Sequence, residues 1–159
     1  MDNINCYQRR KRLRMKEKMQ QLEQDMMRFA HIMMPESMAR FGLRLVLEEF
    51  CGGNPRINFC FYGDECRLDK EIEINIYRIA CELINNALKH AKSTVINVQL
   101  IIGKEILSLT VQDDGCGFDK KAVKQGLITV HSRAGLIGAD LFIYSQEGKG
   151  SEISVELRI

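Results

Sequence analysis

Residues 69–92 have the sequence DKEIEINIYRIACELINNALKHAK, which predicts one long amphipathic helix. Apolar residues recur in it at the three- and four-residue spacing of a single helix face. They are Ile72, Ile76, Ile79, Ala80, Leu83, Ala87 and Leu88. We therefore expect a helix from Asp69 to about Lys92 that buries this face against another layer of structure.

The segments on both sides of this helix are rich in β-branched and aromatic residues, which predicts strands. In chain order the expected strands are Ile57–Tyr62, Thr94–Ile102, Glu105–Gln112, Leu141–Ser145 and Glu152–Ile159. Gly103-Lys104 predicts a hairpin turn, and Gly148-Lys149-Gly150 joins the last two strands. Two shorter helices are expected, from Glu36 to Cys51 and up to Ile137. A sheet with helices on one face is an α+β two-layer sandwich.

The amino-terminal part has a different pattern. Seven basic residues lie between Arg9 and Lys18, opposed only by Glu17. Apolar residues then recur at alternating steps of four and three, as Met15, Met19, Leu22, Met26, Phe29 and Met33. This is the seam of a helix that packs on a partner helix, and Pro35 ends it. We expect a dimerisation helix in residues 1–35 and a separate domain in residues 36–159.

Length and composition exclude several classes of protein. The chain has 159 residues, a net charge of +2 and 45% hydrophobic residues, which is typical of one folded domain and not of a polycation or a disordered chain. It has no apolar run long enough to span a membrane and no signal peptide. Its six cysteines include no C-x-x-C pair, which favours reduced thiols. We expect a cytoplasmic protein.

Two clusters of residues indicate chemistry. Glu82, Asn86 and Lys89 share one face of the long helix, although an ordinary solvated face would give the same pattern. Asp113-Asp114-Gly115-Cys116-Gly117-Phe118 follows a predicted strand, and its glycines allow the backbone to turn sharply beside a ligand. A carboxylate at a strand end can accept a hydrogen bond from a purine amino group. An ordinary glycine-rich loop remains the alternative for this second cluster.

Gly148-Lys149-Gly150-Ser151 is not a P-loop. That motif requires G-x-x-x-x-G-K-[ST] at the start of a helix. Residues 151–159 alternate between polar and apolar side chains, which predicts a strand.

The two clusters, followed by Gly126-Leu127 and then Gly148-Lys149-Gly150-Ser151, form an ordered set of motifs. In this order the sequence resembles the ATP-binding catalytic domain of bacterial two-component sensor histidine kinases, of the GHKL superfamily. The resemblance covers about Arg28 to Ile159 and is nearest to the short-lid, nitrate-sensor-like subfamily. It implies a Bergerat-type fold that binds ATP and Mg²⁺ and transfers the γ-phosphoryl group to a histidine.

The resemblance also implies a role for individual residues. Glu82 matches the acid that orients or deprotonates the attacking group, and Asn86 matches the Mg²⁺ ligand. Asp113 matches the acid that recognises the adenine amino group. The remaining ATP-binding positions implied are Lys89, His90, Gly115, Gly117, Gly126, Leu127, Gly148, Gly150 and Ser151. A helix that starts near Leu127 would present free N–H groups to phosphate.

The sequence departs from the family pattern at two places. Lys124 and Thr129 replace a glycine and an asparagine in the second glycine box, which affects the lid. No histidine of the chain is followed by an acid, and the Phe29–Pro35 segment resembles the second helix of the dimerisation hairpin, so His31 is expected to be structural. The acceptor histidine is then expected outside this chain, upstream or on a partner protomer. The basic run is compatible with the cytoplasmic portion of a membrane-anchored sensor.

The resemblance further implies a homodimer and a response regulator as partners. Three alternatives remain open. The chain could be a GHKL serine kinase of the anti-sigma-factor type, a non-catalytic coiled-coil module, or a nucleic-acid binder that uses Arg9–Lys18. The helical segment Arg28–Cys51 favours the histidine kinase over the serine kinase, and the basic run is typical of a solvated or membrane-proximal face. We expect no nucleic-acid partner.

Overall fold

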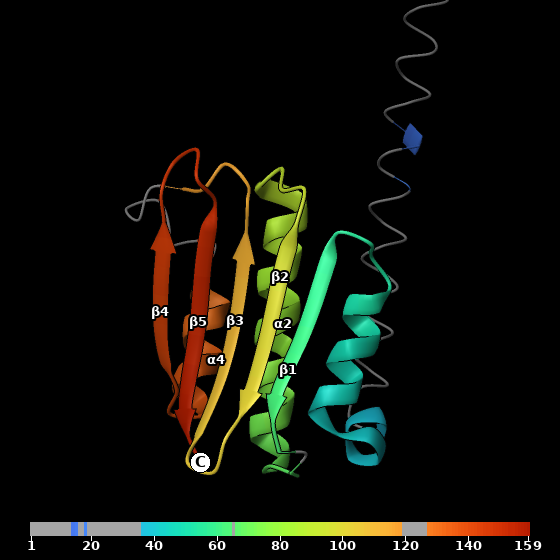
Figure 1. Cartoon of the computed structure of the whole chain (residues 1–159), viewed down its shortest axis with the longest axis vertical. Coiled ribbons are helices and arrows are strands. Elements are labelled where there is room, and N and C mark those ends of the chain that lie inside the picture. The colour runs from blue at the N-terminus through green and yellow to red at the C-terminus, as the bar shows by residue number, and fades with distance from the viewer. Residues whose placement is uncertain (1–13, 16–17, 19–35, 65, 119–126) are drawn as a thin grey trace, which may run out of the picture. The chain divides into compact units, whose positions relative to one another are not determined.

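The computed structural model describes residues 14, 15, 18, 36–64, 66–118 and 127–159 of the chain. Its central feature is a five-stranded sheet with α2 and α4 packed on one face (Figure 1). The labelled elements, in chain order, are β1 (Ile57–Gly63), α2 (Lys70–His90), β2 (Ile96–Ile102), β3 (Ile106–Asp113), α4 (Ile128–Leu136), β4 (Asp140–Ser145) and β5 (Ser151–Arg158). The predicted α+β two-layer sandwich is confirmed.

The sheet has the strand order β1-β2-β3-β5-β4. β1 and β2 are parallel, and the other three neighbouring pairs are antiparallel. A parallel pair needs a long crossover connection, and α2 supplies it between β1 and β2. The pairing of β3 with β5 places Asp113 opposite Ser151, so two distant parts of the sequence meet at one end of the sheet.

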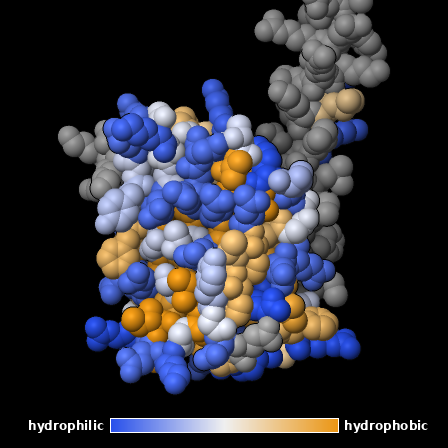
Figure 2. Space-filling view, viewed as in Figure 1, coloured by the Kyte–Doolittle hydropathy of each residue, from blue (hydrophilic) through white to orange (hydrophobic). Residues whose placement is uncertain are grey.

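The core lies between the sheet and the helices. Strand residues alternate, so that Val98, Leu100, Leu109 and Val155 are at most 1% exposed on the helix side. Their neighbours in sequence face the other way. Figure 2 views the molecule from that second side, where polar side chains are interspersed with apolar ones.

The predicted long helix is confirmed as α2. The Asp69 side chain accepts a hydrogen bond from the Glu71 N–H (3.1 Å) and caps its first turn. The helix ends at His90, earlier than expected. Lys92 has a φ of 52°, a left-handed conformation that cannot continue a helix.

Each observed strand begins or ends one or two residues away from its expected bounds. β2 begins at Ile96 and not at Thr94, because the N–H groups of Thr94 and Val95 donate to the Asp114 carboxylate (2.8 and 3.0 Å). The β2–β3 turn is longer than the expected two residues, since β3 begins only at Ile106. The carbonyl of Glu105, in this turn, accepts a hydrogen bond from the Ile159 N–H (3.0 Å).

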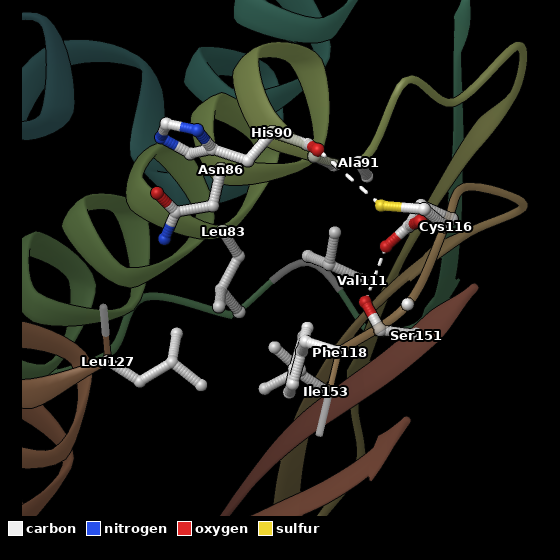
Figure 3. Close-up of a pocket in the computed structure, with 13 residues that line it drawn as sticks. Leu83, Asn86, His90, Ala91, Val111, Cys116, Phe118, Leu127, Ser151 and Ile153 are labelled. Carbon is white, nitrogen blue, oxygen red and sulfur yellow. Dashed lines mark hydrogen bonds between the residues drawn. The ribbon is translucent and has the colours of Figure 1, made fainter. Parts of the chain in front are cut away.

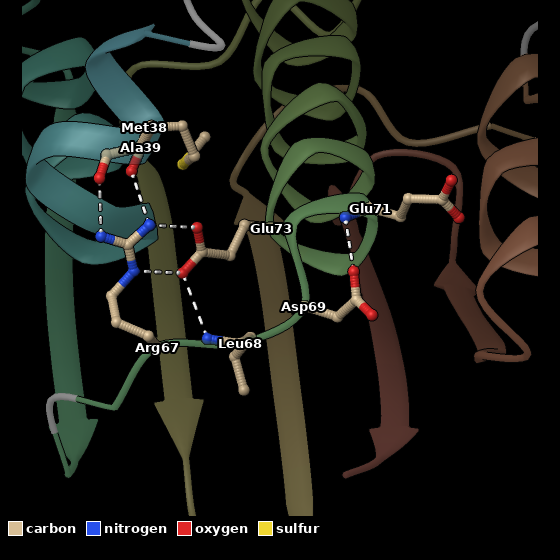
Figure 4. Close-up of polar contacts among 7 residues, drawn as sticks. All are labelled: Met38, Ala39, Arg67, Leu68, Asp69, Glu71 and Glu73. Atoms are coloured by element: carbon tan, nitrogen blue, oxygen red, sulfur yellow. Dashed lines mark hydrogen bonds and ion pairs between the residues drawn. The ribbon is translucent and has the colours of Figure 1, made fainter.

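Residues 36–52 are helical but bent, because Gly42 has a φ of 78° in the middle of the segment. Two carbonyl groups of the turn before the bend, those of Met38 and Ala39, accept hydrogen bonds from the Arg67 guanidinium at 3.0 Å each (Figure 4).

Glu73 of α2 holds Arg67 in this position. The Glu73 side chain is only 1% exposed, and its carboxylate accepts from Nε and Nη2 of Arg67 and from the Leu68 N–H, all at 3.2 Å (Figure 4). The buried charge is therefore fully paired. The Arg67–Glu73 cluster joins the bent helix to the first turn of α2.

The chain divides into two compact units, Met1–Ser37 and Met38–Ile159. The expected dimerisation seam lies outside the described residues except for Met15, which is helical and 59% exposed. Among the helices that the structure describes, none is long and apolar enough to cross a membrane.

Candidate functional site

A cavity of about 400 Å³ opens between the carboxy-terminal half of α2 and the ends of β3 and β5 (Figure 3). Its polar lining residues include Asn86, His90, Asp113 and Ser151. The other lining residues are Leu83, Ala87, Ala91, Val111, Cys116, Gly117, Phe118, Leu127 and Ile153. The cavity is thus a mainly apolar slot with a few polar groups, which is typical of a small-molecule site.

Asp113 is the buried acid of this slot. It ends β3, is 7% exposed, and accepts a hydrogen bond from the Gly115 N–H on Oδ1 (2.8 Å). The Ser151 hydroxyl donates to Oδ2, because the β3–β5 pairing places Ser151 directly opposite. The carboxylate is fixed in orientation and still has lone pairs free for a donor group on a ligand.

The loop after β3 is held between two other parts of the fold. The Cys116 N–H donates to the Ala91 carbonyl at the end of α2, and the Gly148 N–H donates to the Cys116 carbonyl, both at 2.7 Å. A Cβ on Gly115 would lie 2.2 Å from the Ala91 carbonyl oxygen, and one on Gly117 would lie 2.1 Å from that of Gln146. Only glycine fits at these two positions.

Asp114 anchors the same loop from the other side. Its carboxylate accepts hydrogen bonds from the Thr94 hydroxyl and from the N–H groups of Thr94 and Val95. The Thr94 hydroxyl, followed by the Val95 N–H, lowers the pKa of this exposed carboxyl. Asp114 therefore ties the end of β3 to the start of β2, whereas Asp113 faces the cavity.

The residues proposed on α2 divide into two sets. Asn86 and His90 line the cavity from the same side of the helix (Figure 3). Glu82 is half-buried one turn earlier and lies outside the lining, and Lys89 is exposed and also outside it.

The later glycines act through the backbone. Gly148 and Gly150 have φ values of 76° and 81° in the β4–β5 turn, and neither lines the cavity. A Cβ on Gly150 would lie 2.0 Å from the Asp113 carbonyl oxygen, so this glycine permits the close approach of the turn to the acid.

The start of α4 borders the cavity. Leu127 lines it and precedes the first helical residue, and no side chain of the described residues caps the helix with a hydrogen bond. The N–H groups at such a helix start can bind an anion. Gly126 and Lys124 lie outside the described residues, and Thr129 is exposed in the first turn of α4.

The apolar walls of the cavity are not predicted from the sequence. Leu83 and Ala87 of α2, and Ala91 just after it, line the slot at four-residue spacing. The sequence pattern predicts Leu83 and Ala87 as part of the buried helix face and gives Ala91 no role. Val111 and Ile153 are paired neighbours on β3 and β5 and face the helices, as the alternation of strand residues predicts. Their side chains line the cavity between the sheet and α2.

The side chains of the site bear on how a Mg²⁺ ion would be bound. Among the described residues, no group of three His, Cys, Asp or Glu side chains is arranged to hold a metal ion. An ion held mainly by ligand phosphates and water requires only a single protein oxygen, and the Asn86 amide in the lining can supply it.

Comparison with known protein families identifies the family of this chain. Residues 71–159 match the family described as "Histidine kinase-, DNA gyrase B-, and HSP90-like ATPase". The chain belongs to this ATPase family. The match includes α2, the Asp113 loop and both later glycine segments, so the resemblance inferred from the motifs is confirmed.

Relatives within this ATPase family include two bacterial kinases. The chain is 37% identical over 101 residues to an uncharacterised sensor-like histidine kinase of Chloroflexus aurantiacus, covering 58% of this chain and 17% of the relative. It is 33% identical over 118 residues to the signal transduction histidine-protein kinase/phosphatase DegS of Bacillus subtilis, covering 69% and 30%. The chain therefore spans less than a third of either relative.

A solved structure supports the ATPase fold. The histidine kinase domain of the blue-light activated histidine kinase of Erythrobacter litoralis superposes with a TM-score of 0.58 at 24% identity. The superposition covers 72% of this chain and 64% of that chain.

Proposed function

We propose that the chain binds Mg·ATP in the Asp113 cavity and transfers the γ-phosphoryl group to a histidine in a two-component signalling system. The observation that carries this proposal is the buried Asp113 carboxylate, oriented by Gly115 and Ser151 at the end of an apolar slot. Such a carboxylate can accept the amino hydrogen of adenine while the slot walls enclose the ring. Kinship with sensor histidine kinases supports the reaction type.

Each group has a part in this reaction. Asn86 would hold the Mg²⁺ that neutralises phosphate charge, and the N–H groups at the start of α4 would bind phosphate oxygen. Glu82, one turn before Asn86, would orient the attacking imidazole or accept its proton. Phosphoryl transfer depends mainly on positioning and charge stabilisation, which these groups can supply.

The partners follow from the same proposal. The acceptor is a histidine on a dimerisation helix of the same or the partner protomer, and the phosphoryl group then passes to a response regulator. We further propose that residues 1–35 contribute to a homodimer and that the domain works in the cytoplasm.

Removal of the Asp113 carboxylate tests ATP binding. Asp113→Asn loses a charge-assisted hydrogen bond to the adenine amino group, so we expect ATP affinity to fall about 10- to 100-fold. Isothermal titration calorimetry with a non-hydrolysable ATP analogue measures it. Asp140→Asn, an exposed acid at the start of β4, is the matched control and should bind as the wild type does. Equal affinities for both variants would overturn the assignment.

Transfer needs a separate test. Glu82→Gln should keep its ATP affinity but lose transfer to a supplied acceptor, a histidine-bearing dimerisation hairpin of a sensor kinase. Wild-type product should lose its phosphate in acid, as phosphohistidine does. An acid-stable product would instead favour the serine-kinase alternative, and equal transfer by Glu82→Gln would exclude this role for Glu82.

A further inference from the structure

A polar stripe on α2 continues beyond the cavity. Arg78, Glu82, Asn86 and His90 follow one another at four-residue intervals, so each lies about 6 Å further along the helix and roughly on the same side. Asn86 and His90 line the cavity, whereas Arg78 does not. Arg78 lies one turn before Glu82, at one end of the stripe, and His90 lies at the other end, which lines the cavity that also holds Asp113.

α4 brings a second arginine to this end of the stripe. α4 packs beside α2 on the same face of the sheet (Figure 1). Leu127, just before α4, borders the cavity, and Arg133 follows on the helix side that also carries the buried Val130 and Ala134. Burial lowers the pKa of Arg133, the positive charge of Arg78 lowers it further, and Glu82 raises it. The three charged groups are therefore close enough to interact.

The charges in this group are not balanced. Two guanidinium groups share one carboxylate, which leaves an excess positive charge. Within the part of the chain that the structure describes, the Nε of Arg78 is buried without a hydrogen-bond partner. A buried donor without an acceptor is unfavourable and uncommon in folded proteins. An oxygen-rich anion bound to the guanidinium groups would supply the missing negative charge.

We propose that Arg78 and Arg133 form a cationic pair that binds the terminal phosphoryl group of the nucleotide and so distinguishes triphosphate from diphosphate. This inference rests on the proposed function, because the base must bind at Asp113 for the phosphate tail to pass Asn86 and reach Glu82. His90 and Glu82 are about 12 Å apart along α2, which suits an extended nucleotide. Guanidinium groups bind phosphate oxygens through paired N–H donors.

The test compares ATP with ADP on the full chain. Arg78→Gln and Arg133→Gln should each weaken Mg·ATP binding at least 10-fold and change Mg·ADP binding less than 2-fold, measured by calorimetry with a non-hydrolysable ATP analogue and with ADP. Arg158→Gln removes the same charge from an exposed position at the end of β5 and should change neither. Thermal unfolding of each variant reports whether it is folded.

Conservative variants keep the test decisive if a glutamine variant does not fold. Arg133→Lys and Arg78→Lys retain the charge and the apolar stem but lose the paired donors. They should still weaken ATP binding more than ADP binding, but by a smaller factor than the glutamine variants do. Equal weakening of ATP and ADP binding would indicate a purely structural role and overturn the inference. Unchanged ATP binding would overturn it too.

The outcomes also separate this inference from the proposed function. If the wild-type chain binds ATP and ADP through Asp113 but the arginine variants keep its ATP-to-ADP preference, only the inference fails. If the wild-type chain binds neither nucleotide, both fail.

Discussion

Gly115 lies in the loop after β3, where this loop packs against the end of α2. A methyl group at this position would be 2.2 Å from the Ala91 carbonyl oxygen, so either the loop or the helix end must move. Gly115→Ala should therefore destabilise the fold by about 1–3 kcal/mol and weaken nucleotide binding. Urea denaturation measures the first effect and calorimetry the second.

Gly135 is the matched control for this substitution. It lies in α4, and a Cβ there would meet no atom of the described residues within 4 Å. Gly135→Ala should stabilise the protein by about 0.5–1 kcal/mol, since glycine is unfavourable inside a helix. Similar losses of stability in both variants would contradict the close contact at Gly115.

The cysteines provide a second test at the residue scale. Burial raises the pKa of Cys51 and Cys81 to about 12, so their thiols should react slowly with iodoacetamide at pH 8. Cys116 is exposed and lines the cavity, whereas Cys60 and Cys66 are exposed elsewhere. Bound nucleotide should therefore slow the alkylation of Cys116 alone, as measured by mass spectrometry of the peptides. Equal protection of Cys60 would argue against this cavity as the nucleotide site.

At the scale of elements, the Arg67–Glu73 cluster joins the bent helix, residues 36–52, to α2. Arg67→Ala would leave the buried carboxylate of Glu73 unpaired. Because Arg67 itself is 56% exposed and water can take its place, the free energy of unfolding should fall by about 1–3 kcal/mol, less than for a pair buried on both sides. Replacement of both residues, by Arg67→Met with Glu73→Leu, should recover much of this loss because no buried charge remains. Equilibrium urea denaturation measures both changes.

An exposed ion pair is the control for this cluster. Glu48→Ala breaks the 2.7 Å ion pair between Arg44 and Glu48, whose side chains are 30% and 53% exposed, respectively. The free energy of unfolding should fall by less than about 1 kcal/mol. If Arg67→Ala cost no more than Glu48→Ala, burial of Glu73 would not determine the strength of the joint.

At the scale of the whole molecule, the expected division lies near residue 36 and the compact unit begins at Met38. We expect a fragment of residues 36–159 to unfold cooperatively and to bind ATP as tightly as the full chain, because the described cavity residues all lie within it. The fragment should be monomeric, since the apolar seam is absent from it. Urea denaturation, calorimetry and sedimentation equilibrium test these three expectations in turn. A dimeric fragment, or one with weakened ATP binding, would contradict this division of labour.

Much of the site was predictable because it depends on local signals. The spacing of Glu82 and Asn86 follows from helix geometry, and the position of Asp113 at a strand end follows from the strand before it and the glycines after it. Ser151 was placed near the nucleotide by resemblance alone. Its hydrogen bond to Asp113 depends on the register between β3 and β5, which no local pattern contains.

The order of the motifs and the periodicity of the apolar residues were enough to determine the fold class, the long helix and the acid at position 113, because each depends on neighbours within a few residues. Only the tertiary structure decided that Ala91 touches the Gly115 loop, that Arg67 pairs with the buried Glu73, and that Arg133 lies near Arg78. No local sequence pattern contains these contacts, because they form only when the helices pack on the sheet.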